Sequence, residues 1–400
     1  MKKHQISIRS LIIIAVCALI YAGLLYYANT GWNGYTITES SGIEYETAKV
    51  LEVVSDSTVS DPSIEGFRRG DKDLKLQITS GRYKGDVVTV TDYLSAMYNV
   101  DVDEGDSVAV RIDTVDVGDY QVSIYNYDRS VYLIAFVIIF AVALILIGGF
   151  QGFKAFVGLV FTFVSIVFLL VPLTLRGYPS VVLTVILVGV TTIVSFYLLG
   201  GWQPKTIGAA IGCVCGVCCA ALLGAAAIRL VSISAYQMDE AEALLLVQNE
   251  NGLHMKGLFL SSVLLASLGA VMDIAMSIAS SMEELKNKRP DISVKELFLS
   301  GMKVGRDASG TMANTLVLAI AGSSFNMMIL IYSYQVSFIQ LINTDFVTIE
   351  LIRGIAGSLG IILAIPFVAS LTAVLLNRQG ALGNDIPGKM KKQEKIRKNK

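Results

Sequence analysis

Five polar side chains interrupt two long apolar stretches in the second half of the chain, and their types could support proton or cation chemistry. Asp273, Ser277 and Ser281 recur every four residues, so they lie along one side of a helix. Thr311 and Asn314 share a face of the next apolar stretch. A carboxylate deep in a membrane helix is costly unless it is paired, protonated or facing a water-filled cavity. We therefore take these residues as a candidate intramembrane polar or proton site.

Four charged residues flank this region in two pairs. Arg306 and Asp307 are adjacent at the start of the second apolar stretch, where we predict a charge pair at the inner mouth of a membrane domain. Glu350 and Arg353 are three residues apart, which makes them neighbours on a helix, and we predict an outer ion pair. Two interpretations of Asp273 stay open: it could carry a coupling proton, or it could be a structural acid that pairs with Arg306.

Motifs of several common enzyme classes are missing from this sequence. The chain has two histidines, His4 and His254, so no H-E-x-x-H metal site is possible, and it contains no G-x-x-x-x-G-K-[ST] phosphate loop. An aspartyl dyad needs two facing carboxylates, and we expect Asp307 nearer the membrane surface than Asp273. We therefore expect no enzyme activity, no metal and no cofactor. Any transport would be ion-coupled, channel-like or energised by a partner.

Two further clusters have a more ordinary interpretation. All five cysteines lie in apolar segments, and they are Cys17, Cys213, Cys215, Cys218 and Cys219. Residues 215–218 form a C-x-x-C, but apolar burial disfavours the thiolates that metal or redox chemistry needs, so we interpret the cysteines as small packing residues. The acidic run 101–106 lacks the spacing and closing glutamate of an EF-hand, so we predict a solvated turn there.

Composition and hydropathy determine the class of protein. Apolar residues make up 54% of the 400 residues and charged residues 16%. The apolar residues come in blocks of about twenty, as membrane-spanning helices require, which excludes a soluble enzyme and a nucleic-acid-binding protein. We predict an α-helical polytopic membrane protein with eight transmembrane helices, at 11–28, 131–149, 155–175, 177–204, 206–228, 257–282, 308–334 and 354–377.

The segment between the first two predicted helices differs from the rest in charge. Between Thr30 and Arg129 there are 19 Asp and Glu residues against 9 Lys and Arg, although the net charge of the whole chain is only −1. Apolar and β-branched residues alternate there between Gly-containing turns, which predicts strands at 45–54, 74–79, 86–91, 107–112 and 120–125. We predict a small all-β domain, either an OB-like barrel or a sandwich.

The distribution of Lys and Arg gives the expected domain order and orientation. The domains are an anchor helix (1–29), the acidic β-domain (30–129), a seven-helix membrane domain (130–376) and a basic tail (377–400). The basic clusters at the N-terminus, at 286–306 and in the tail predict cytoplasmic termini and an extracytoplasmic β-domain in the cell membrane. We expect residues 283–303 to lie along the inner interface as an amphipathic helix.

Glycines recur at helical spacing in two of the predicted spans. Gly208, Gly212 and Gly216 follow one another at four-residue intervals in the fifth span. In the eighth span, Gly354 and Gly357 form a similar pattern at a three-residue interval. Small residues at such intervals let two helix backbones approach closely, so we predict tight helix contacts, either within one chain or between chains.

Three blocks of the membrane domain together resemble one known family. They are Gly-Ala-Val-Met-Asp-Ile-Ala-Met-Ser-Ile-Ala-Ser-Ser (269–281), Gly-Arg-Asp-Ala-Ser-Gly-Thr-Met-Ala-Asn-Thr-Leu-Val-Leu-Ala (305–319) and Glu-Leu-Ile-Arg-Gly-Ile-Ala-Gly-Ser-Leu-Gly-Ile-Ile-Leu-Ala-Ile-Pro (350–366). In these blocks the chain resembles the YibE/F family of bacterial multi-pass membrane proteins, over roughly residues 130–376. The long insert after the first helix looks like the YibE-type member, which in Gram-positive bacteria is typically paired with a shorter YibF-type protein.

The resemblance implies a set of characteristic residues rather than a reaction, because the family has no settled activity. Carried onto this chain, they are Asp273, Ser277, Ser280, Ser281, Arg306, Asp307, Gly310, Thr311, Asn314, Thr315, Glu350, Arg353 and Gly357. Residues 319–322 depart from the family's more common Ala-Tyr-x-Gly, which puts a role for an aromatic residue there in doubt.

Two classes of function are consistent with these features. The first is a component of an ion-coupled or partner-energised transport system, and the second is a non-catalytic scaffold for assembly of the cell envelope. In either case we expect the lipid bilayer and a second membrane protein as partners, either a YibF-type protein or another copy of the chain, and no nucleic acid. The sequence names no substrate.

Overall fold

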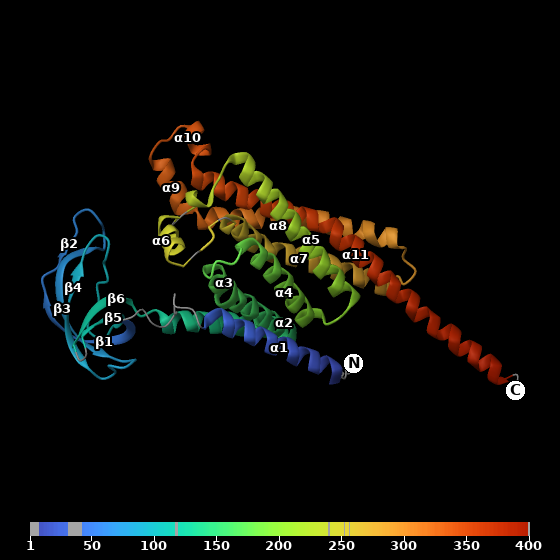
Figure 1. Ribbon diagram of the computed structural model, residues 1–400, viewed down its shortest axis with the longest axis horizontal. Coiled ribbons are helices and arrows are strands. Elements are labelled where there is room, and N and C mark those ends of the chain that lie inside the picture. Colours follow the sequence, from blue (N-terminus) through green and yellow to red (C-terminus); the bar gives the residue numbers. More distant parts are fainter. Residues whose placement is uncertain are drawn as a thin grey trace. The chain divides into compact units, whose positions relative to one another are not determined.

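The computed structural model describes residues 8–30, 42–116, 119–238, 241–251, 253–255 and 257–398 (Figure 1). The chain divides into two compact units. One consists of Met1–Thr30 with Ile147–Lys400, and the other is Gly31–Leu146. The first unit is a helical bundle, and the second holds all the strands together with the start of helix α2. The predicted combination of apolar helices with a β-domain is therefore confirmed.

The β-domain is one antiparallel sheet in which β3 pairs with β1, β2 and β4, β1 pairs with β5, and β5 pairs with β6. Its strands are β1 (Ile43–Asp56), β2 (Val59–Ser60), β3 (Arg68–Ile78), β4 (Val87–Leu94), β5 (Ser107–Asp116) and β6 (Asp119–Tyr127). Strands β4 and β6 also contact each other, so the sheet curls into a half-barrel. The alternating residues of β1, β3 and β5 fill its core, as Leu74, Leu76 and Val110 do. The OB-like topology stays a prediction.

Strand β3 begins at Arg68, well before the predicted start at residue 74. The charged run that opens it, with Arg69, Asp71 and Lys72, gives no apolar signal in the sequence. The run is nevertheless a strand, because its residues pair in register with Leu94 and the rest of β4. Lys72 takes an inward position that an apolar residue would normally occupy.

The helices of the chain are bounded as follows: α1 (Ile8–Asn29), α2 (Ser130–Ser165), η1 (Ile166–Leu170), α3 (Val171–Leu175), α4 (Ser180–Gly200), α5 (Pro204–Val231), η2 (Ala235–Gln237), α6 (Ala241–Asn251), α7 (Leu258–Lys288), α8 (Val294–Ser323), α9 (Phe325–Ser333), α10 (Phe338–Ile342) and α11 (Asp345–Lys398). Proline at N1 begins α5, and a capping box between Ser293 and Glu296 begins α8.

Five helical segments among the described residues are long and apolar enough to cross a membrane, or six when α8 and α9 are counted as one bent span. They are Ser130–Leu175, Ser180–Gly200, Pro204–Val231, Leu258–Lys288 and Asp345–Arg378. The sequence predicts eight spans, and two differences account for most of the gap. The first of these segments covers two predicted spans and is broken at Gly149, whose φ of 57° and ψ of −137° are not helical. Helix α1 is also apolar, but its stretch Ala15–Asn29 is shorter than a membrane span.

Helix α8 differs from the prediction at both ends. An interfacial helix at 283–303 and a separate span from residue 308 were expected, but α7 continues to Lys288 and α8 runs unbroken from Val294 to Ser323. No proline interrupts α8, and Gly301 and Gly305 pack against the neighbouring helices α7 and α11. The predicted span then breaks at Ser324, where α8 and α9 meet at a bend of 61°.

The glycines of α5 bring its backbone against α11 within one chain. A Cβ atom built on Gly212 would lie 2.7 Å from the Cα of Val368, and one on Gly208 would lie 2.9 Å from the Cα of Thr372. Gly216 faces Ala364 in the same way. In α11, Gly357 packs against Leu316 of α8, whereas Gly354 has only ordinary contacts, the nearest being 3.7 Å from Ile320 of α8.

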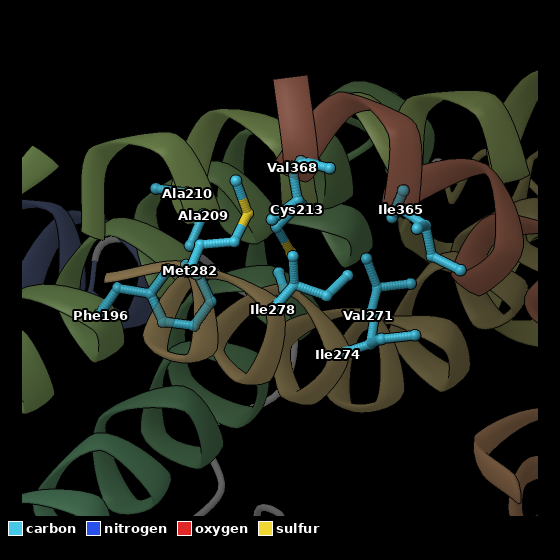
Figure 2. Packing of buried hydrophobic residues seen from close by; sticks show 14 of the residues in the cluster. Phe196, Ala209, Ala210, Cys213, Val271, Ile274, Ile278, Met282, Ile365 and Val368 are labelled. Atoms are coloured by element: carbon cyan, nitrogen blue, oxygen red, sulfur yellow. The ribbon is translucent and has the colours of Figure 1, made fainter. Parts of the chain in front are cut away.

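A continuous apolar core joins α4, α5, α7 and α11. Figure 2 shows Cys213 of α5 near Ile278 of α7 and Val368 of α11, with Phe196 of α4 further to the left beside Met282, all in this core. Cys213 is fully buried, and its sulfur lies 3.9 Å from the Thr192 hydroxyl. The packing is dense because the glycines on α5 allow α11 to approach. This cluster holds the bundle together.

Basic residues tie several helix ends together at one end of the bundle. Lys205, at the start of α5, forms a 2.6 Å ion pair with Glu283 near the end of α7. Lys286 donates to the Asn377 side chain of α11 and to the carbonyl of Pro290 in the α7–α8 turn. The structure thus places the start of α5, the end of α7 and residue Asn377 of α11 close together.

Candidate binding site at the break between α8 and α9

A cavity of about 1000 Å³ lies beside the bend between α8 and α9. Its walls come from the end of α8, from α9, from the turn at Gln335, from α10 and from the first turns of α11. Gln335 has a positive φ of 50°, which lets the chain reverse between α9 and α10. Most lining residues are apolar, including Met328, Phe338 and Leu351. A helix that breaks next to a cavity is a common feature of membrane binding sites, because the freed backbone groups need partners other than lipid.

Glu350 supplies the charged group in the wall of this cavity. Its Oε1 accepts a 2.6 Å hydrogen bond from Nη1 of Arg353, one turn further along α11. Both side chains are largely buried, Glu350 at 13% and Arg353 at 23% exposure. The second carboxylate oxygen of Glu350 and the Nε of Arg353 are buried and have no partner among the described residues. Each residue of the pair therefore has one buried polar atom that no described group satisfies, and of the two residues Glu350 lines the cavity.

A second hollow of about 510 Å³ shares Ser324, Phe346 and Glu350 with the first cavity. It is lined by polar residues of the helix break, among them Ser323, Ser324 and Asn326. Glu350 thus lines both a mostly apolar cavity and a more polar one. The arrangement can hold a molecule with an apolar body and a hydrogen-bonding or charged end.

The predicted proton site on α7 lies on the outer surface of the helix, away from the core. Asp273, Ser277 and Ser281 are all exposed, whereas Ile274 and Ile278 between them are buried. No described side chain forms an ion pair or hydrogen bond with Asp273. The structural pair with Arg306 is therefore not formed within the chain.

The predicted residues of α8 also lie on an exposed face. Arg306, Asp307, Thr311 and Asn314 are all exposed, and the Thr311 hydroxyl donates a hydrogen bond to the carbonyl of Ala308. The inner charge pair is not formed within the chain, since the structure records no ion pair among the described residues for either Arg306 or Asp307. The structure brings Glu350 and Arg353 together, but it does not join them to the polar residues of α7 and α8.

A charged cluster in the β-domain occupies the acidic run for which the sequence predicts a solvated turn. The Nζ of Lys72 donates to the Asp101 carboxylate at 3.0 Å, the Val102 carbonyl at 2.7 Å and the Asp103 carboxylate at 2.9 Å. The Lys72 side chain is only 1% exposed. Burial by itself would lower the pKa of Lys72, but its hydrogen bonds to Asp103 and Asp101 outweigh burial and raise it. Residues 101–103 of the acidic run thus bind the ammonium group of Lys72.

Asp92 on strand β4 borders this cluster and should make the stability of the β-domain depend on pH. Burial and the nearby charge of Asp101 raise the pKa of Asp92 from 3.8 to about 6. Because the folded-state pKa is the higher one, the ionised form costs stability: the cost is absent below about pH 4, grows up to about pH 6 and is complete above it. Asp92→Asn should therefore stabilise the domain by about 1–2 kcal/mol at pH 8, allowing for partial solvent screening, and hardly at all at pH 4.

Urea unfolding of a soluble fragment carrying residues 42–128, followed by circular dichroism at the two pH values, measures this difference. A stabilisation by Asp92→Asn that is the same at pH 4 and pH 8 would show that its carboxylate does not titrate in this range.

Sequence reasoning missed the break at Ser324, the cavity beside it and the burial of Lys72. Two signals were present in the sequence. Ser323, Ser324 and Asn326 form a polar interruption in an apolar stretch, and Lys72 alternates in register with Leu74 and Leu76. The first marks a weak point in a helix, and the second places the lysine on the inward face of its strand.

Comparison with known proteins identifies one related family. The family model described as YibE/F-like protein matches residues 136–378, which is more than half of the chain and contains the bundle helices from α4 to α9, the cavity and most of α11. No curated protein and no solved structure matches the chain.

Proposed function

This chain belongs to the YibE/F-like protein family, and from that premise we propose that it is a component of an ion-coupled or partner-energised transport system in the cell membrane. The observation that carries the proposal is the bent helix pair α8–α9 beside a cavity lined by Glu350, whose ion pair with Arg353 leaves one oxygen of the carboxylate without a partner among the described residues. Interrupted helices that border a cavity with a few buried polar groups support substrate binding in many transporters. Asp273, exposed and unpaired on α7, is the residue that we assign to proton coupling.

An orientation belongs to this proposal. With Lys205, Lys286 and the basic start of α8 in the cytoplasm, the cavity faces the outer leaflet and the β-domain lies outside. A single cysteine at residue 295, in a chain whose five native cysteines are replaced, should react with a membrane-impermeant maleimide only after the membrane is opened. Labelling of residue 295 in intact cells would show that the orientation is the opposite one.

Proton flux into proteoliposomes tests the proposed function. Liposomes that contain the full chain and an internal pH-sensitive dye should dissipate an imposed pH gradient faster than protein-free liposomes, under a clamped membrane potential. Asp273→Asn should leave folding unchanged and lower the flux to background, because the amide cannot carry a proton. Glu284→Gln is the matched control, since Glu284 lies on the same helix but is exposed and paired with Lys288. It should keep the full flux.

The second candidate function, an envelope scaffold, predicts no proton flux and no effect of Asp273→Asn. Its supporting observation is an exposed aromatic pair on the β-domain, in which the rings of Tyr45 and Tyr125 lie 4.9 Å apart and both residues are about half exposed. Such a pair suits binding to a partner outside the membrane. Background flux from the wild-type chain, together with wild-type behaviour of Asp273→Asn in cells, would favour the scaffold.

A further inference from the structure

Helix α8 carries a polar seam that none of the described helices covers. Asp307, Thr311, Asn314 and Leu318 are all exposed and follow one another at intervals of four, three and four residues. This is the interval at which one helix meets another in a left-handed pair. The opposite face of α8, with Gly301 and Gly305, is already packed against α7 and α11.

Exposure of this seam to lipid would be energetically unfavourable. Asn314 lies eight residues beyond Arg306 and nine before the end of α8, so it sits about 12–14 Å from either point. The Asn314 amide forms no hydrogen bond with the described residues, and the charges of Arg306 and Asp307 are likewise unpaired there. Polar groups at membrane depth almost always face protein or water rather than lipid. A protein surface should therefore cover this seam.

From these observations we propose that the α8 seam is the interface of a homodimer, in which two copies of this chain pair their α8 helices in parallel. Two copies of one membrane protein insert in the same orientation, so their twofold axis runs perpendicular to the membrane and residues of equal height meet. Arg306 and Asp307 are neighbours of opposite charge at nearly the same height. Arg306 of one copy can therefore pair with Asp307 of the other copy, and the reverse, which makes the patch complementary to itself.

The remaining seam residues fit the same symmetry. An asparagine amide is both donor and acceptor, so Asn314 can pair with Asn314 of the second copy, and a single asparagine in such a seam fixes the register of two helices. Gly310 flanks the seam, is exposed and has no atom within 4 Å of the place where a Cβ would be. Internal packing does not require that glycine, whereas the close approach of a second α8 helix does.

Cysteine cross-linking in native membranes tests the interface. In the full chain without its native cysteines, single cysteines at Thr311 and Leu318 should cross-link into a product of twice the chain mass. Val190 provides the control, because it is exposed at 42% on α4, on the other side of the bundle core, and should give only background product. Equal yields at all three positions, no product at Thr311 and Leu318, or products with a different protein only would overturn the proposal.

Charge exchange tests it in a chain that keeps its native cysteines. Arg306→Asp or Asp307→Arg alone places like charges opposite each other and should weaken self-association about tenfold or more, measured by energy transfer between labelled copies on dilution with lipid. The double exchange restores the reciprocal pairs and should return self-association to the wild-type range. A monomeric wild type at every dilution, or a double variant no better than the single ones, would contradict the homodimer.

Discussion

Gly212→Leu should reduce the yield of folded protein in detergent to a small fraction of the wild type. Even a single Cβ at this position would lie 2.7 Å from both the backbone nitrogen and the Cα of Val368. Backbone atoms of a neighbouring helix cannot turn aside as a flexible side chain can, so α5 and α11 would have to separate. Overpacking in a dense core costs about 1–3 kcal/mol for added methylene groups, and separating this contact would disturb the whole core of Figure 2 as well.

The matched control for this prediction is Gly189→Leu in α4. Gly189 is also a helical glycine in an apolar span, but no atom lies within 4 Å of its Cβ position. Its replacement should leave the yield near that of the wild type, and Cys213→Ser, next to Gly212, should be mild because the two side chains are similar in size. The measurement is the monodisperse fraction by size-exclusion chromatography. Equal yields for the Gly212 and Gly189 variants would contradict the close α5–α11 contact.

Lys72→Met should destabilise the β-domain by about 3 kcal/mol. Methionine replaces the apolar stem of the buried side chain but has no ammonium group, so it leaves the Val102 carbonyl and the facing carboxylate of Asp101 without their donor. Removing one partner of a buried charge pair typically costs about 3–5 kcal/mol. We expect the lower end of that range, because Asp101 keeps Arg68 at 3.3 Å and Asp103 is 84% exposed to water.

Lys75→Met provides the control on the same strand. Lys75 is exposed, so its replacement should change the free energy of unfolding by less than about 0.5 kcal/mol. Urea unfolding of the soluble fragment 42–128 compares the two variants directly. Similar small losses would mean that Lys72 does not hold the 101–103 turn to β3.

The two halves of the candidate site differ in how far the sequence determined them. The Glu350–Arg353 pair was predicted because an interval of three residues makes neighbours on any helix. The cavity was not predicted, because it depends on a bend between α8 and α9 and on the return of α10 and α11 to the same place. For Asp273 the interval placed three polar residues on one side of α7, but it could not tell whether that side faced the core.

By itself, the sequence determined the features that depend on local spacing and composition. Blocks of apolar residues predicted the membrane helices, alternation in the acidic segment predicted most of the β-strands, and three sequence blocks indicated the family that the comparison confirmed. These signals survive in a single chain because hydrophobic period and length determine secondary structure with little help from distant residues.

Only the tertiary structure decided which faces meet. It directed the α5 glycines to α11 of the same chain, joined the predicted interfacial helix and the following span into α8, and broke that span at Ser324. It also buried Lys72 against Asp101 and Asp103, although residues 103–106 stay exposed as the sequence predicted. Each of these outcomes is set by contacts between segments far apart in the chain. A glycine, a serine or a lysine has the same local preferences whether its neighbour is lipid, water or another helix, and only the folded arrangement supplies that neighbour.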